Sequence, residues 1–154
     1  MILALFALLL AIIGGIVFFQ SDLRKNIPFF AKTPIATINN QKFNLLVAKT
    51  AKEQEIGLSE KTSLPENTGM LFLFEKPDYY AFWTKTMKIP VDIIYINKNK
   101  IVTIIENAAP PKSPDETMPI HRPEEPSDKV LEINAGLSQK YGLKKGDEVK
   151  IENL

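Results

Sequence analysis

The sequence predicts a mainly β protein with a minor α component. We expect a small antiparallel β-barrel-like or sandwich domain with one or two short helices, behind an N-terminal transmembrane helix. Seven or eight short apolar segments alternate with turn residues, only two segments have helical spacing, and the first twenty residues carry no charge. The short spacing favours antiparallel pairing and partial barrel closure. The expected division is an anchor at residues 1–20, a tether at 21–34 and a β-rich domain at 35–154.

The N-terminal segment has the length of a membrane span. Residues 2–19 are an unbroken apolar run, and a helix of this length rises about 27 Å, close to the ~30 Å hydrocarbon core of a bilayer. We therefore expect contact with the cell membrane through residues 2–19, as a single-pass anchor. A cleaved signal peptide is the alternative, but it requires a basic start and small residues before the cut. The chain has Phe18, Phe19 and Gln20 there.

Charge and cysteine content argue against nucleic-acid binding and against sites built from cysteine. Three of the 19 Lys and Arg residues and one of the 18 Asp and Glu residues precede residue 35, so the domain carries 16 basic against 17 acidic residues. This balance gives no basic footprint for nucleic acid. The chain has no Cys, which excludes disulfides and thiolate metal sites. We expect no nucleic-acid partner and no cofactor.

The domain is predicted to begin with a hairpin and a short helix. Apolar residues flank Asn39, Asn40 and Gln41, which is the pattern of a β-hairpin. Thr50 followed by Glu53 has the spacing of a capping box, so a short helix is expected to begin here and to end near Gly57.

The central stretch is predicted to contain a strand buried on both faces. Residues 70–74 place Met70, Phe72 and Phe74 on one face, and Leu71 and Leu73 on the other. Beyond it we expect a turn at 75–78, a strand at 79–86, a break at Lys88–Pro90, a strand at 92–97, and a hairpin return at 101–106.

A proline-rich segment separates these strands from the C-terminal ones. Residues 107–128 hold six of the eleven prolines, and connections of this length are usually functional or disordered. The segment is either a lid or docking arm, or a disordered excursion, with candidate residues Pro110, Pro111, Pro114, Pro119, His121 and Arg122. After it we expect a strand at 129–133, helical turns at 135–141, a turn at 142–147 and a strand at 148–152.

Two carboxylates are the candidates for chemistry. Asp92 is in phase with Ile94 and Ile96, so it faces the core and must be hydrogen-bonded or paired. It either pins a loop through backbone N–H groups or faces a ligand. Glu132 is out of phase with its apolar neighbours, and is either a solvated outer residue or a lining residue of the barrel mouth. If they converge in a cleft, the two could act as general acid and base or hold a hard cation.

An aromatic cluster surrounds the only Trp. Trp83 lies close to Tyr79, Tyr80 and Phe82, which form either core or a stacking platform for a ligand. The candidate pocket residues are therefore Asp92, Trp83, Glu132, Met70 and Phe82. His121 is the only His, so no metal site is expected.

The segments GMLFLF, FWTKTMKIPVDIIYIN, IVTII, VLEINAG and GLKKGDEV, in this order over residues 35–152, resemble domain of unknown function family 192. That family is also called uncharacterised protein family 0127. The resemblance implies a small β-rich domain, often behind a signal peptide or membrane anchor, and no established activity. The matching positions are Gly57, Leu58, Gly69, Met70, Phe72, Phe82, Trp83, Pro90, Asp92, Leu131, Glu132, Gly136, Gly146 and Asp147.

Three departures from the family pattern could alter a site. Ser59 stands where the family usually has Met, and residues 84–86 are Thr-Lys-Thr in place of Met-Lys-Asn. Gln54 and Glu55 stand where an Arg commonly precedes the Gly-Leu pair.

The orientation of the domain follows from two opposing arguments. Arg24, Lys25 and Lys32 follow the apolar run, and by the positive-inside rule they place the domain in the cytoplasm. The resemblance instead implies an exported domain, which we take as the expectation.

The leading functional hypothesis is a membrane-anchored, extracytoplasmic domain that binds a small ligand or an envelope protein. One alternative is a carboxylate-dependent hydrolase or lyase that acts on an envelope polymer through Asp92 and Glu132. It requires the two carboxyl groups to lie within about 5–10 Å of each other across an open cleft. A purely structural domain is the second alternative.

Overall fold

The computed structural model describes residues 32–154, so the predicted anchor and nearly all of the predicted tether lie outside the described residues. Within residues 32–154, no helix has the length and apolarity needed to cross a membrane.

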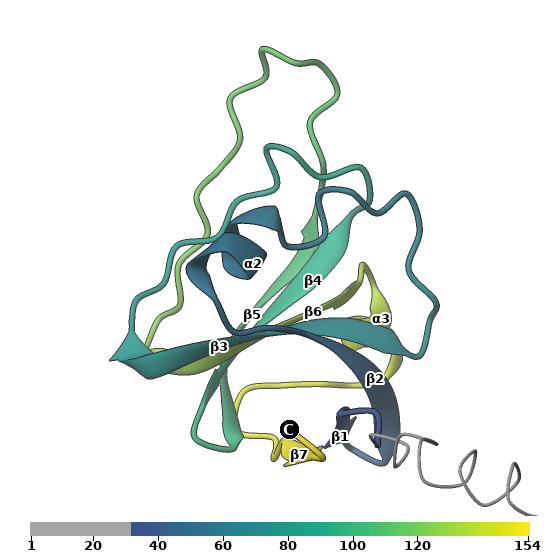
Figure 1. Cartoon of the computed structure of the whole chain (residues 1–154), viewed down its shortest axis with the longest axis vertical. Coiled ribbons are helices and arrows are strands. Elements are labelled where there is room, and N and C mark those ends of the chain that lie inside the picture. The colour runs from purple at the N-terminus through teal and green to yellow at the C-terminus, as the bar shows by residue number, and fades with distance from the viewer. Residues whose placement is uncertain (1–31) are drawn as a thin grey trace, which may run out of the picture. The chain divides into compact units, whose positions relative to one another are not determined.

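A seven-stranded sheet dominates the described part of the chain (Figure 1). Its spatial order is β5-β4-β6-β3-β2-β1-β7, which places β3 in the middle. The strands are β1 (Ile35–Ile38), β2 (Gln41–Ala48), β3 (Thr68–Asp78), β4 (Val91–Asn97), β5 (Lys100–Ala108), β6 (Ser127–Asn134) and β7 (Lys150–Glu152). The mainly β prediction is confirmed.

One strand pair differs from the antiparallel expectation. β2 and β3 pair in parallel, with Leu45 opposite Gly69, whereas all other neighbours in the sheet are antiparallel. Between them the chain forms helix α2 (Ala51–Ile56) and a long loop, and a crossover of this kind returns the chain in the same direction.

The sheet curls until its two ends meet. Lys100, at the start of edge strand β5, forms an isolated bridge with Glu148, just before edge strand β7. The Ile101 amide donates to the Asp147 carbonyl at 3.0 Å, and the Val149 amide donates to the Asn99 carbonyl at 2.8 Å. The closure is local, so the domain is a curled half-barrel.

Helix α2 begins at the predicted capping box. The Thr50 hydroxyl accepts from the Glu53 amide, and the Glu53 carboxylate accepts from the Thr50 amide at 2.8 Å. Two backbone donors at the helix start are thereby satisfied. The helix ends at Gly57, whose φ of 48° favours glycine. The second short helix, α3 (Leu137–Lys140), lies within the predicted helical turns.

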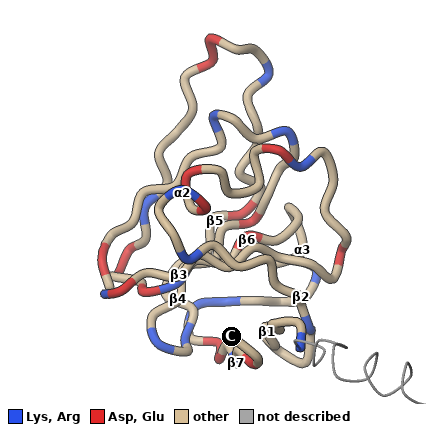
Figure 2. Tube along the Cα trace, in the orientation of Figure 1, with Lys and Arg blue, Asp and Glu red and all other residues tan. Residues whose placement is uncertain are grey.

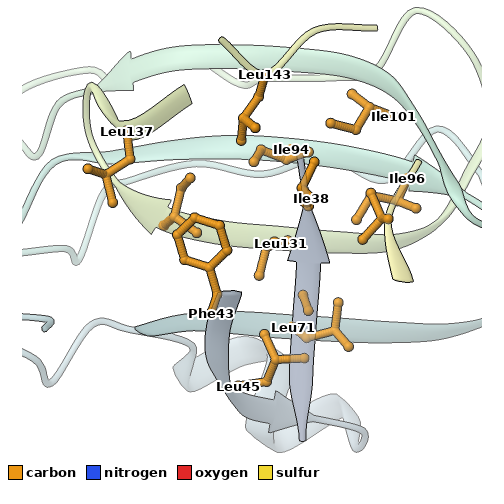
Figure 3. Close-up of a cluster of buried hydrophobic side chains, with 13 residues drawn as sticks. Ile38, Phe43, Leu45, Leu71, Ile94, Ile96, Ile101, Leu131, Leu137 and Leu143 are labelled. Atoms are coloured by element: carbon orange, nitrogen blue, oxygen red, sulfur yellow. The ribbon is translucent and has the colours of Figure 1, made fainter. Parts of the chain in front are cut away.

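The two faces of the sheet bury separate cores. Inside the curl, Leu71 of β3 packs with residues of β1, β2, β4 and β6, including Ile38, Phe43, Ile94 and Leu131 (Figure 3).

On the opposite face lie Phe72, Ile93, Tyr95 and Val130, covered by Leu58 and by aromatic and aliphatic residues of the 79–90 loop. The alternation at residues 70–74 therefore predicted both faces of β3 correctly.

Two local predictions are wrong. β3 continues through the expected turn at 75–78, and its pairing with β6 becomes irregular between Leu73 and Asp78. Residues 79–86 do not form a strand. Only Phe82 pairs, through an isolated antiparallel bridge to His121, because this segment covers the second core instead of joining the sheet.

Candidate functional site

A cavity of about 380 Å³ opens beside the second core, between α2 and the 79–90 loop. Its volume lies within the ~300–1,000 Å³ typical of small-molecule sites. Five aromatic residues line it: Phe72, Phe74, Tyr80, Phe82 and Trp83. The polar lining consists of Gln54, Glu55, Thr86 and Glu132.

The aromatic walls are held by ring–ring contacts. Tyr80 stacks on Phe74 with centroids 3.6 Å apart, and Phe82 meets Phe72 edge-to-face at 5.0 Å. Phe82 also contacts Tyr95 of β4 edge-to-face at 5.9 Å. Trp83 is 59% exposed, so the indole forms the rim of the cavity and not its base. The predicted aromatic cluster thus divides into core and an exposed surface.

Helix α2 supplies the wall that faces β3. The Gln54 side-chain amide donates to the Leu73 carbonyl at 2.7 Å, which holds the helix against the strand. At Gly57 an added Cβ would lie 3.4 Å from the Phe72 ring, in addition to the strain of a positive φ. A distance of 3.4 Å is ordinary van der Waals contact, so the positive φ, and not crowding against the Phe72 ring, favours glycine here.

Glu132 is the buried polar group of the cavity. It lies on β6 opposite Met70 of β3 and Ile93 of β4, and it is only 4% exposed. Its Oε2 atom has no hydrogen-bond partner among the described residues. Burial raises the pKa of the Glu132 carboxyl to about 8, so at neutral pH the group is mostly a protonated acid. In that form it both donates and accepts a hydrogen bond.

Asp92 has a different environment. It is fully buried, and its Oδ1 accepts from the amides of Asn107 (2.9 Å) and Gly136 (3.0 Å). Its Oδ2 accepts from the Ser138 amide at 2.8 Å. The carboxylate thus joins the end of β5 to the start of α3, which is the pinning role considered from the sequence. Asp92 does not line the cavity.

The sheet register separates the two carboxylates. Asp92 pairs with Ile133, the residue after Glu132, and successive side chains of a strand point to opposite faces. Asp92 therefore faces the inner core, and Glu132 faces the cavity. This corrects the hydrolase or lyase hypothesis in the form that joins Asp92 and Glu132, because the two carboxyl groups do not converge across a cleft.

The proline loop, defined by the structure as residues 109–126, is fastened at its base. His121 and Phe82 exchange backbone hydrogen bonds of 2.8 and 2.9 Å, and the Tyr95 hydroxyl donates to the His121 carbonyl at 3.0 Å. Arg122 donates to the Tyr79 carbonyl at 3.1 Å. Burial lowers the pKa of the His121 imidazole.

The outer part of the proline loop is the long green excursion in Figure 1. Of its candidate residues, Pro114 and Pro119 are exposed, whereas Pro110 and Pro111 are half-buried. Pro114 lines a second cavity of about 450 Å³, and Trp83 borders both cavities.

Of the predicted pocket residues, Trp83, Phe82 and Glu132 meet at the cavity, whereas Met70 packs against the second core beside it. Sequence reasoning missed the wall formed by the last turn of α2. The available signal was the departure from the family pattern, because Gln54, Glu55 and Thr86 all line the cavity. Among residues 32–154, no group of three or more His, Cys, Asp or Glu side chains could hold a metal ion.

The curled sheet and its aromatic cavity define a small β-rich half-barrel domain. The family model of DUF192, described as an uncharacterised ACR, matches residues 34–151, and the chain belongs to this family. Comparison with curated proteins finds no match.

Two solved structures are similar to this chain. A protein of unknown function from Novosphingobium aromaticivorans shares 36% identity at a TM-score of 0.66, over 75% of this chain and 83% of its own. A protein from Sinorhizobium meliloti, described as a candidate transcription regulator, shares 27% identity at a TM-score of 0.67. That likeness covers 79% of this chain and 93% of the other.

Proposed function

We propose that this domain binds a small organic molecule in the cavity between α2, β3 and the 79–90 loop. The observation that supports the proposal most strongly is Glu132, a buried carboxyl with an unpartnered oxygen at an open, aromatic-lined cavity. An unsatisfied buried polar group destabilises a fold by about 1–3 kcal/mol, so its presence calls for a partner. A ligand with a polar group at one end and an apolar body would give the Glu132 carboxyl a hydrogen-bond partner and would pack against the aromatic walls.

The lining divides into two parts that suit such a ligand. Phe72, Phe74 and Phe82 offer apolar ring surface beside the core, and Trp83 offers an exposed ring at the entrance. Most small-molecule sites combine apolar walls with a few polar groups that fix orientation. Here Glu132 is the orienting group.

A nucleic-acid role is a weaker proposal, although one structural relative is described as a candidate transcription regulator. Lys and Arg are interspersed with Asp and Glu along the described trace (Figure 2). Nucleic-acid-binding domains usually gather Lys and Arg on one face.

The binding test uses three ring-bearing probes of equal size: benzylamine, benzyl alcohol and benzoate. Isothermal titration of the full chain in a non-ionic detergent should detect at least one of them. Thr86→Trp fills the cavity and should abolish that binding. Thr117→Trp makes the same change in the second cavity and should leave it intact. Binding by none of the three probes, or equal loss in both variants, would overturn the proposal.

For location, we propose that residues 2–19 anchor the chain in the cell membrane with the domain on the extracytoplasmic side, where a ligand or an envelope protein is available. The support is the uncharged apolar run and its span-like length. C-terminal fusions to alkaline phosphatase and to a fluorescent cytoplasmic reporter should show phosphatase activity only. Fluorescence without phosphatase activity would place the domain in the cytoplasm.

A further inference from the structure

The charge of the cavity lining has one sign. Of its fourteen described residues, two are glutamates, Glu55 and Glu132, and none is Lys, Arg or His. Glu55 is exposed at the last turn of α2, and Glu132 is buried on β6. An anionic ligand would meet two carboxyl groups and no basic side chain, so the lining disfavours it.

The aromatic walls also favour a positively charged ligand. The face of an aromatic ring carries negative potential, and a cation within about 6 Å of a ring centroid is attracted to it, most strongly by Trp. Trp83, Tyr80 and three Phe residues line this one cavity. Cation–π attraction is strongest where water is excluded, and the phenylalanine walls border the buried second core.

The unpartnered oxygen of Glu132 specifies the polar group of the ligand. Oε2 lacks a donor among the described residues, and a protonated amine brings N–H donors together with a positive charge. A hydrogen bond between such a group and a carboxylate is roughly twice as strong as a neutral one. The aromatic rings then surround the carbon atoms next to the nitrogen.

Resting on the function proposed above, we infer that the ligand of the cavity is an organic cation, a protonated amine with an apolar body, held by Glu132 and the surrounding aromatic rings. The nitrogen donates to the Glu132 carboxylate, and the apolar body lies between Phe74, Phe82 and Trp83. Selectivity against neutral and anionic molecules of the same size follows from the acidic, aromatic lining.

Binding of a cation is coupled to the loss of a proton from Glu132. Without ligand, the Glu132 carboxyl is mostly protonated below pH 8, whereas an ammonium ion binds the deprotonated carboxylate. The other titratable groups near Glu132 do not supply this proton. Burial raises the pKa of the Tyr95 phenol on β4 and of the Tyr80 phenol in the 79–90 loop, so both stay neutral. The remaining acid is Glu55 on α2, which is exposed, and Arg122 lies outside the lining and bonds the Tyr79 carbonyl.

The test compares benzylamine, benzyl alcohol and benzoate by isothermal titration of the full chain. Benzylamine should bind at least ten-fold more tightly than benzyl alcohol, and benzoate should bind most weakly. Between pH 6 and 7.5 the affinity for benzylamine should rise by roughly ten-fold per pH unit, while that for benzyl alcohol stays constant.

Two variants give the control. Glu132→Gln keeps the size of the side chain, and should remove both the preference for benzylamine and its pH dependence. Glu148→Gln removes an exposed carboxylate that bonds Asn99 outside the cavity, and should change neither. Equal binding of benzylamine and benzyl alcohol would overturn the cation inference and leave the binding function standing. Failure of all three probes would overturn the function itself.

Discussion

Asp92 and Glu132 lie one register step apart on neighbouring strands, yet their side chains open onto opposite faces of the sheet. Asp92 accepts hydrogen bonds from three backbone N–H donors, whereas Glu132 Oε2 has no partner among the described residues. The Asp92 carboxylate joins the end of β5 to the start of α3, whereas Glu132 is a buried acid beside the cavity. This contrast supports a structural role for Asp92, and it is the basis for the binding role that we propose for Glu132.

Replacing Asp92 by Asn should lower the free energy of unfolding by about 2–3 kcal/mol, because one carboxylate oxygen becomes an N–H donor facing a backbone N–H. Equilibrium urea denaturation measures the change. Asp115→Asn alters an exposed acid of the proline loop and should stay within about 0.5 kcal/mol of the wild type. If Asp92→Asn abolished benzylamine binding without a loss of stability, Asp92 would belong to the binding site.

The stability of the protein should fall as pH rises from about 4.5 to 8, by up to about 1.4 kcal/mol per pH unit. The folded-state pKa of Glu132 is raised, so the folded state binds more protons than the unfolded state in this window. The stabilisation is complete below the unfolded pKa and is lost as pH passes the folded pKa. Urea denaturation at a series of pH values should show this slope.

Glu132→Gln should flatten that slope and make the variant more stable than the wild type at pH 8, because no charge then has to be buried. Glu55→Gln, an exposed acid of the same cavity, should keep the wild-type slope. A wild type whose stability is constant over this range would show that Glu132 titrates as an ordinary carboxyl.

Gly69→Ala should destabilise the fold by about 1–3 kcal/mol. An added Cβ would lie 2.8 Å from Leu131 Cδ1 and 2.9 Å from the Glu132 carbonyl oxygen, and a backbone carbonyl in a sheet cannot easily move away. Gly142→Ala is the comparison: its φ is positive but no atom lies within 4 Å, so only about 1 kcal/mol of backbone strain is expected. Urea denaturation of both variants should give Gly69→Ala the lower free energy of unfolding. The reverse order would contradict the close packing of β3 against β6.

Trp83→Ala should leave the free energy of unfolding within about 0.5 kcal/mol, since the indole is mostly exposed. It should weaken benzylamine binding by roughly two- to five-fold, the range of an exposed cation–π contact. Tyr79→Ala removes another exposed aromatic that does not line the cavity, and should leave binding unchanged. Isothermal titration decides, and equal effects of the two substitutions would argue against a specific role of Trp83.

Local signals in the sequence predicted local structure well. The spacing of Thr50 and Glu53 predicted the capping box, and the alternation at residues 70–74 predicted a strand buried on both faces. The aromatic run at 79–86 misled, because aromatic residues favour strands and also favour the layer that covers a sheet. The parallel pairing of β2 with β3 depends on a crossover, which residue periodicity does not encode.

The cavity was harder to predict because its walls come from distant parts of the chain. Glu132 is out of phase with Leu131 and Ile133, and this phase is normally solvent when a sheet has one core. Here the sheet has a core on each face, so the out-of-phase residue is buried as well. The cavity lies between α2 and the 79–90 loop, and neither segment alone has a sequence pattern that predicts this arrangement.

The most direct test of the binding account is a carbon-13 NMR titration of the Glu132 carboxyl, alone and with saturating benzylamine. We predict that the Glu132 carboxyl titrates near pH 8 without ligand and that benzylamine lowers its pKa. Addition of benzylamine should leave the resonance of Glu148 unchanged. If Glu132 titrated near its ordinary value of 4.5 and did not respond to benzylamine, the buried acid at the cavity would not be a ligand site.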